Sequence, residues 1–180
     1  MKVFIQLLTV LWFFLPAAFA NMMPLLLNKI PVLGQAVDFG KKFRGKAIFG
    51  KNKTFRGFLV GIFFAILVLY LQVLLYPYMS EYSFFDYSLV NVWLLGLLFG
   101  FGALFGDLVE SFFKRQLDIS PGSIWAFFDQ VDWIFGGLIF VGFYLGFDLY
   151  LALGTIFVYG ILHVLSRYVG YLMGITKTRI

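Results

Sequence analysis

Residues 87–106 read YSLVNVWLLGLLFGFGALFG and contain no charged side chain, and Asp107 follows them directly. An α-helix needs about 20 predominantly apolar residues to cross the hydrocarbon core of a bilayer. Other uncharged stretches lie at residues 3–20, 57–80, 133–147 and 149–166. The whole chain is 62% hydrophobic and 13% charged, whereas soluble domains are about half apolar and a quarter charged. These features predict an all-α integral membrane protein.

The two uncharged stretches nearest the C-terminus are separated only by Asp148. One continuous helix over residues 133–166 would be about 50 Å long, whereas the hydrocarbon core is about 30 Å thick. The chain is therefore expected to turn back at Gly146-Phe147-Asp148. The sequence thus predicts one membrane domain over residues 1–180 with five spans, at about residues 3–20, 57–80, 87–113, 129–147 and 149–170, and polar loops at 21–56 and 114–128.

Positive charges are distributed unevenly between the predicted loops. Of the 14 lysines and arginines, the loop at residues 21–56 holds eight, whereas the loops after the second and fourth spans hold none. Cytoplasmic loops carry an excess of lysine and arginine. The N-terminus is therefore expected outside, and the C-terminus and both polar loops in the cytoplasm, in a multi-pass protein of the cell membrane.

The first residues resemble a secretory signal, because Lys2 and an apolar stretch precede Ala18-Phe19-Ala20. Cleavage after Ala20 would leave the loop with eight positive charges outside, against the charge rule. We therefore interpret the segment as a retained first span. The apolar stretch Met22–Leu33 is interrupted by two prolines, and we expect it to lie along the membrane interface.

The end of the third span carries a polar helical face. Asp107, Glu110, Ser111 and Lys114 are spaced i, i+3, i+4 and i+7, so they share one side of a helix. The residues between them are apolar and cover the remaining surface of the same helix.

Asp129 and Asp132 open the fourth span on the same side of the membrane. Carboxylates at two facing helix ends repel one another unless a cation lies between them, and Mg²⁺ takes one or two carboxylates together with substrate phosphates. We predict Asp107, Asp129 and Asp132 as Mg²⁺ ligands. Glu110 is explained equally well as a further ligand and as a solvated partner of Lys114. For the whole cluster, the alternative is a charged membrane rim paired with basic residues nearby.

A glycine-framed basic stretch, GKNKTFRG at residues 50–57, directly precedes the second span. Backbone N–H groups and cations in such a stretch can bind phosphate oxygens. A helix that begins at Thr54 or Phe55 would add the positive end of its dipole. Taken alone, the stretch is explained better as a topology signal, and it is not a Walker motif.

The chain contains no cysteine and one histidine. Disulfides, thiolate metal sites and catalysis by several histidines are therefore excluded. His163 and Arg167 lie near the cytoplasmic end of the last span. We interpret His163 as a packing residue, and Arg167 as an interfacial anchor in preference to a phosphate contact.

Two sequence motifs together resemble a known family. The pattern Gly106-Asp107-Leu108-x-Glu110-Ser111-x-x-Lys114-Arg115, then Pro121-Gly122 and Asp129-x-x-Asp132, is similar to the signature of CTP:phosphatidate cytidylyltransferases, the CDP-diacylglycerol synthases. Lys53-Thr54-Phe55-Arg56-Gly57 resembles the Lys-Thr-x-Glu-Gly element of the bacterial enzymes, with the arginine of the archaeal branch. The preceding Asp38-Phe39-Gly40-Lys41 also resembles the archaeal branch, and the short chain looks like the archaeal CDP-archaeol synthases.

The resemblance implies a Mg²⁺-dependent cytidylyltransferase that joins CTP to 2,3-di-O-geranylgeranylglyceryl phosphate and releases pyrophosphate. It implies catalytic roles for Asp107, Lys114, Arg115, Asp129 and Asp132, the two basic residues stabilising the leaving pyrophosphate. It implies CTP or phosphate contacts from Asn52, Lys53, Thr54, Arg56, Ser111, Pro121 and Gly122. The expected partners are CTP, an isoprenoid ether lipid phosphate and membrane lipids, with no nucleic acid. Participation of a monovalent cation stays open.

Two alternatives stay open at this point. Ester phosphatidate is an alternative acceptor, because the ether preference follows from the archaeal resemblance alone. A small cation channel or transporter is the alternative from another class, although its path would need polar residues through the whole membrane. Gln72 and Asn91 are the notable polar residues within the second and third spans.

Overall fold

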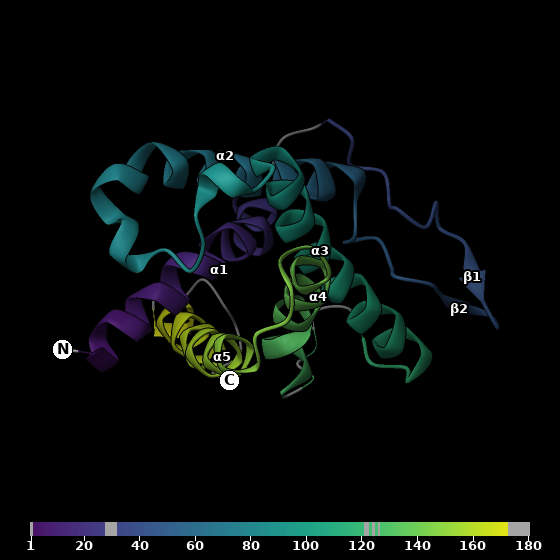
Figure 1. Cartoon of the computed structure of the whole chain (residues 1–180). Coiled ribbons are helices and arrows are strands. Elements are labelled where there is room, and N and C mark those ends of the chain that lie inside the picture. Colours follow the sequence, from purple (N-terminus) through teal and green to yellow (C-terminus); the bar gives the residue numbers. More distant parts are fainter. Residues whose placement is uncertain (1, 28–31, 121–122, 124, 126, 173–180) are drawn as a thin grey trace.

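The computed structural model describes residues 2–27, 32–120, 123, 125 and 127–172. In this part of the chain, five helices are long and apolar enough to cross a membrane (Figure 1). They are α1 (Lys2–Leu26), α2 (Phe55–Met79), α3 (Val92–Gln116), α4 (Phe128–Leu145) and α5 (Leu149–Leu172). The predicted all-α membrane fold is confirmed. A small antiparallel hairpin, β1 (Lys42–Phe43) and β2 (Lys46–Ala47), lies between α1 and α2.

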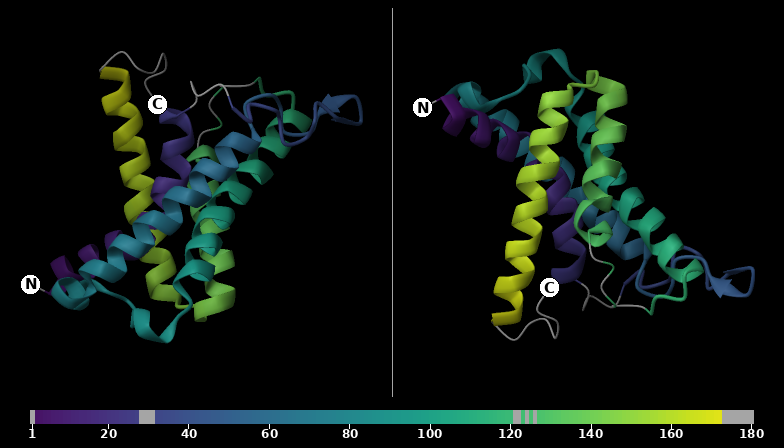
Figure 2. Two further views of the ribbon diagram at one scale, coloured as in Figure 1. Left: turned by 90° about the horizontal axis from the view of Figure 1, so that it is seen from above. Right: turned by 90° about the horizontal axis from the view of Figure 1, so that it is seen from below.

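The helices alternate in direction along the chain, so one end of the bundle collects functional segments (Figure 2). We call this end the polar end. It comprises the C-terminal ends of α1, α3 and α5, the N-terminal ends of α2 and α4, and residues 32–54. At the opposite end the predicted turn is confirmed, because α4 ends at Leu145 and α5 begins at Leu149. Gly146 adopts a φ of 88° in this turn.

Helix boundaries differ from the predicted spans most at the end of α1 and the start of α3. α1 continues to Leu26 with two prolines inside it, so the start of the segment predicted to lie along the interface prolongs the first span. Neighbouring helices and side chains satisfy the backbone groups that prolines free in membrane helices. α3 begins at Val92, not at residue 87, because the Asn91 side chain accepts a hydrogen bond from the Leu94 amide and caps the helix. Of the interfacial segment, residues 28–31 lie outside the described residues.

The core is an aromatic cluster at the middle of the bundle. Phe14 of α1 is fully buried, with its ring centroid 5.5–5.8 Å from those of Phe99, Trp133 and Tyr159. These four rings come from α1, α3, α4 and α5, and aromatic pairs at such separations are stabilising. The cluster therefore fixes α1 as the central helix against which the others pack.

Two hydrogen bonds inside the apolar core also end on α1. Pro16 has no N–H, so the carbonyl of Trp12, four residues earlier, lacks its usual helical donor. The buried side chain of Gln72 donates to this carbonyl at 2.6 Å. The Tyr159 hydroxyl donates to the Leu11 carbonyl, also at 2.6 Å. α2 and α5 are thus each tied to α1 by a polar contact that cannot exchange with water.

Glycines bring the backbones of α3 and α4 into direct contact. A Cβ on Gly106 would lie 2.1 Å from the carbonyl oxygen of Asp132, and a Cβ on Gly136 would lie 2.2 Å from that of Gly102. Small residues permit such close packing between membrane helices. The contact places Asp107, which follows Gly106, beside the first turn of α4.

We expect Gly136→Ala to destabilise the protein, because the added methyl group cannot fit without separating α3 from α4. Overpacking of this kind typically costs about 1–3 kcal/mol. The fraction of purified protein that stays monodisperse after heating in detergent measures the effect.

Gly160→Ala in α5 is the matched control, because a Cβ there meets nothing within 4 Å. Equal thermal stability of the two variants would contradict the close packing of α3 on α4.

Candidate active site

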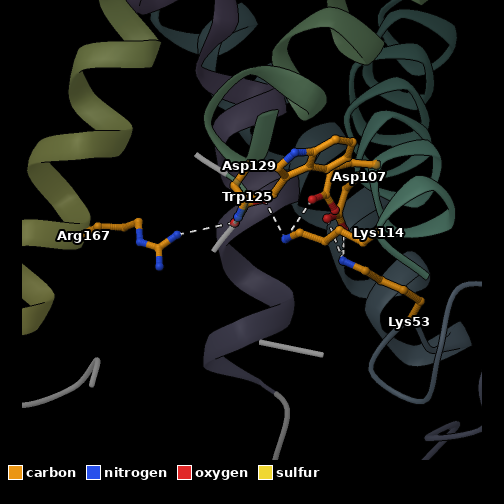
Figure 3. Close-up of polar contacts among 7 residues, drawn as sticks. Lys53, Asp107, Lys114, Trp125, Asp129 and Arg167 are labelled. Carbon is orange, nitrogen blue, oxygen red and sulfur yellow. Dashed lines mark hydrogen bonds and ion pairs between the residues drawn. The ribbon is translucent and has the colours of Figure 1, made fainter. Parts of the chain in front are cut away.

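A cavity of about 690 Å³ opens at the polar end of the bundle. All five helices and the segment before α2 contribute to its wall, and the close-up in Figure 3 shows its ionic contacts. Its charged lining residues are Lys51, Lys53, Arg56, Asp107, Glu110, Lys114, Arg115, Asp129, Asp132 and Arg167. The cavity thus combines carboxylates with a larger number of cations.

The segment that precedes α2 is held in place by a buried acid. The Asp38 carboxylate accepts hydrogen bonds from the amides of Gly40, Phe49 and Gly50 at 2.9–3.0 Å. Burial by itself raises the pKa of Asp38, but these backbone hydrogen bonds outweigh it and hold the pKa below its usual value. Asp38 therefore stays charged at neutral pH and fixes the start of the basic stretch at residues 50–57.

The basic stretch continues into the first turn of α2. Thr54 is the N-cap, and its hydroxyl accepts a hydrogen bond from the Gly57 amide at 3.2 Å. α2 thus begins at Phe55, two residues before the span predicted at about residues 57–80. The amides of Phe55 and Arg56 donate to the carbonyls of Gln35 and Leu33, so this turn is fastened to the segment after α1. The positive end of the α2 dipole lies at the cavity.

Lys53 connects this stretch to the third span. Its Nζ lies 2.6 and 2.5 Å from the two carboxylate oxygens of Asp107, and both side chains are about a quarter exposed (Figure 3). The two motifs that resemble the cytidylyltransferase family are therefore in direct contact, although 54 residues separate them.

Three carboxylates form a compact group within the cavity. Oxygen atoms of Asp107, Glu110 and Asp132 all lie within 4.8 Å of one another. Of the three, Asp132 makes no ion pair with any residue that the structure describes. Three oxygen donors at this separation suit a hard divalent cation such as Mg²⁺. The donor set therefore fits the predicted metal and favours the ligand interpretation of Glu110.

Asp129 lies in the same cavity but outside this group of three. Its carboxylate is 2.6 Å from Lys114 Nζ and 3.6 Å from Arg167 Nη1, and it accepts a hydrogen bond from the Trp125 amide (Figure 3). Lys114 also lies 2.7 Å from Glu110. In this structure Asp129 thus keeps the buried Lys114 next to the group of three carboxylates. The role of Asp129 as a metal ligand stays a prediction.

The remaining predicted residues are found as follows. The cavity wall includes Asn52, Thr54, Ser111 and Arg115, together with the charged residues named above. Pro121 and Gly122 lie outside the described residues. His163 and Arg167 also line the cavity, although sequence reasoning treated them as a packing residue and an anchor. Their spacing of i, i+4 behind the buried Tyr159 was the signal that could have placed them inward.

Comparison with known proteins agrees with this geometry. A family model described as CarS-like, CDP-archaeol synthase, matches residues 3–179. A CDP-archaeol synthase of Thermococcus gammatolerans is 43% identical over 131 residues, covering 72% of this chain and 71% of the relative. Another from Methanococcoides burtonii is 33% identical over 156 residues, covering 80% and 89% of the two chains.

The fold has a counterpart among solved structures. A structure described as an intramembrane enzyme for archaeal membrane lipids biosynthesis superposes with a TM-score of 0.67 at 28% sequence identity. The match covers 87% of this chain and 90% of that one. Family model, relatives and structure agree over most of the chain, which therefore belongs to the CarS-like CDP-archaeol synthase family.

Proposed function

We propose that the protein transfers CMP from CTP to 2,3-di-O-geranylgeranylglyceryl phosphate, forming CDP-archaeol and pyrophosphate. The observation that carries this proposal is the cavity at the polar end, where the three-carboxylate group is surrounded by cations within a bundle of membrane-spanning helices. A nucleotide and a lipid headgroup can meet in such a place, because it opens where helix ends reach the membrane surface. Membership of the CDP-archaeol synthase family supports the same reaction.

The reaction needs charge neutralisation more than it needs a general base. A phosphate monoester has a second pKa near 6, so the lipid phosphate is already an anionic nucleophile at neutral pH. One of its oxygens forms a bond to the α-phosphorus of CTP, while the bond from that phosphorus to the β-phosphate oxygen breaks. Pyrophosphate leaves with the electron pair, and no proton has to be removed from the nucleophile.

The cations near α2 and α3 are suited to the triphosphate. Lys53 and Arg56 flank the capped N-terminus of α2, and Arg115 lies next to Gly50, with its Cδ 3.8 Å from where a Cβ would stand. Basic side chains bind phosphate groups through charge-assisted hydrogen bonds, and the dipole of the helix adds positive potential beside them. Positioning and electrostatic stabilisation supply most of the catalysis in phosphoryl-type transfers, so these residues would act by fixing and neutralising CTP.

The metal proposed here is Mg²⁺, held by Asp107, Glu110 and Asp132. Bound Mg²⁺ neutralises phosphate charge and orients the phosphate groups for displacement. Lys53 pairs with Asp107 and Lys114 with Glu110 in this structure, and a cation bound by these acids would free both lysines to interact with the triphosphate. In this proposal Asp129 positions Lys114, which differs from its sequence-based assignment as a ligand.

The channel alternative is not favoured by the packing. Apolar side chains fill the middle of the bundle next to the polar end. They include the fully buried Phe14 of α1, Phe99 of α3 and Ile134 of α4. A cation path would need polar groups or water at this level. Only the ends of the helices offer the acidic residues that a cation would follow.

The direct test is incubation of purified protein with radiolabelled CTP, Mg²⁺ and the ether lipid phosphate. We expect a labelled CDP-lipid, and less of it with ester phosphatidate at equal surface concentration. The product is separated by thin-layer chromatography and identified by mass. Ion flux in liposomes without CDP-lipid formation would overturn the proposed function.

The proposed metal ligands can be separated from the residue that positions Lys114. We expect Asp132→Asn and Asp129→Asn both to lower activity, each by about 100-fold or more. Asp132→Asn should also weaken Mn²⁺ binding, followed by electron paramagnetic resonance, whereas Asp129→Asn should leave it within about threefold.

Asp118→Asn is the matched control, because Asp118 is exposed and pairs with Lys46 outside the cavity. Equal loss of Mn²⁺ binding in the Asp129 and Asp132 variants would restore Asp129 as a ligand. Unchanged Mn²⁺ binding in Asp132→Asn would refute the three-carboxylate site.

The polar end is proposed to face the cytoplasm, with the N-terminus outside, because the basic residues gather there. The chain lacks cysteine, so single cysteines can be introduced into a silent background. In spheroplasts, a membrane-impermeant maleimide should label Ser88→Cys, near the opposite end, without permeabilisation. It should label Lys42→Cys on the β-hairpin only after permeabilisation. The reverse pattern would invert the proposed orientation.

A further inference from the structure

The cations of the cavity come from two parts of the bundle. Lys51, Lys53, Arg56, Lys114 and Arg115 come from α2, α3 and the segment before α2. Arg167 comes from α5 and approaches Asp129 from the side away from Lys114 and Lys53 (Figure 3). The reaction brings together two phosphate-bearing substrates. Each cation group could therefore bind a different one, and the substrate on the α5 side remains to be assigned.

Arg167 belongs to the inward face of a helix whose other face is apolar and exposed. Tyr159, His163 and Arg167 are spaced four residues apart and share one face of α5. Tyr159 is buried in the aromatic cluster, and the other two line the cavity. The opposite face carries exposed apolar residues, among them Leu162, Leu165 and Val169.

The part of the cavity wall that the end of α1 contributes includes exposed apolar residues. Pro24 and Leu25 of α1 line the same cavity, and Leu25 is 70% exposed. α1 and α5 pack against one another, and residues towards the C-terminal end of each helix line the same cavity. A ligand with long hydrocarbon chains can lie along these helices while its headgroup reaches Arg167. A water-soluble triphosphate gains no stabilisation from contact with an apolar wall.

The charges of the two substrates match the same division. A triphosphate carries more negative charge than a phosphate monoester, whose charge is about −1.5 to −2 at pH 7. The larger cation group surrounds the N-terminus of α2, where the helix dipole adds positive potential. A guanidinium has five donors in a fixed fork that suits a phosphate bidentately, so contact with Asp129 is compatible with a phosphate contact as well.

We propose that Arg167 binds the phosphate of the lipid acceptor and, with His163 one turn before it, forms the acceptor side of the active site. This inference rests on the proposed function and assigns a substrate to one side of the same cavity. Arg167 holds the acceptor phosphate so that one of its oxygens faces the α-phosphorus of CTP, which the other cation group holds. The Asp129 carboxylate lies 3.6 Å from Arg167 Nη1, and its negative charge orients the guanidinium toward the carboxylates.

The test is steady-state kinetics in mixed micelles, with CTP and the ether lipid phosphate varied separately. We expect Arg167→Gln to raise KM for the lipid phosphate about 10- to 100-fold and to change KM for CTP less than about twofold. Arg167→Lys, which keeps the charge and loses the fork, should lie between Arg167→Gln and the native protein. Arg115→Gln should show the opposite split, with KM for CTP raised.

Arg44→Gln is the matched control, because Arg44 is exposed on the β-hairpin and outside the cavity wall. Direct binding of radiolabelled CTP to Arg167→Gln shows that the variant is folded, and it should equal binding to the native protein.

Equal rises in both KM values, or a rise for CTP alone, would overturn the assignment of Arg167 to the acceptor. Unchanged kinetics would overturn it as well and leave Arg167 as an interfacial anchor. Failure of the native protein to form any CDP-lipid would instead refute the proposed function.

Discussion

The contact between the backbones of α3 and α4 is the constraint on which the site depends. Gly102, Gly106 and Gly136 let the two helices approach until a Cβ no longer fits between them. Only at this distance can Asp107 and Glu110 of one helix and Asp132 of the other come within 4.8 Å. Three carboxylates repel one another in a partly apolar setting, so the stability of the glycine crossing offsets the cost of assembling the acidic group.

The cations are supplied by a different device, a loop fixed from within. Asp38 organises the segment before α2 through three amides, and the Thr54 cap fixes where the helix begins. Lys53 is thereby delivered to Asp107 from a segment without long secondary structure. Side chains held by such a rigid loop lose little freedom when they bind phosphate, which favours precise placement of a flexible nucleotide.

The sequence predicts the five spans and one polar helix face, but not which side chains pair between different helices. Uncharged length predicts five helices and the turn at Gly146-Phe147-Asp148, and the spacing of Asp107, Glu110 and Lys114 places them on one face. Which acid meets which lysine depends on how α3 crosses α4, and no local pattern encodes that crossing angle. Arg167 was interpreted as an anchor because its helix neighbours are apolar. Only the packing of α5 against α1 and α4 turns it inward.

The proline in α1 has a consequence for how this sequence can vary. Pro16 leaves the Trp12 carbonyl open, and Gln72 fills it from α2. Without Pro16, a helical N–H would occupy the Trp12 carbonyl, and the buried Gln72 amide would lose its acceptor. Without Gln72, the Trp12 carbonyl would be buried without a hydrogen-bond donor. Pro16 and Gln72, 56 positions apart, are therefore expected to depend on each other, so that substitution at either one is tolerated best when the other changes with it.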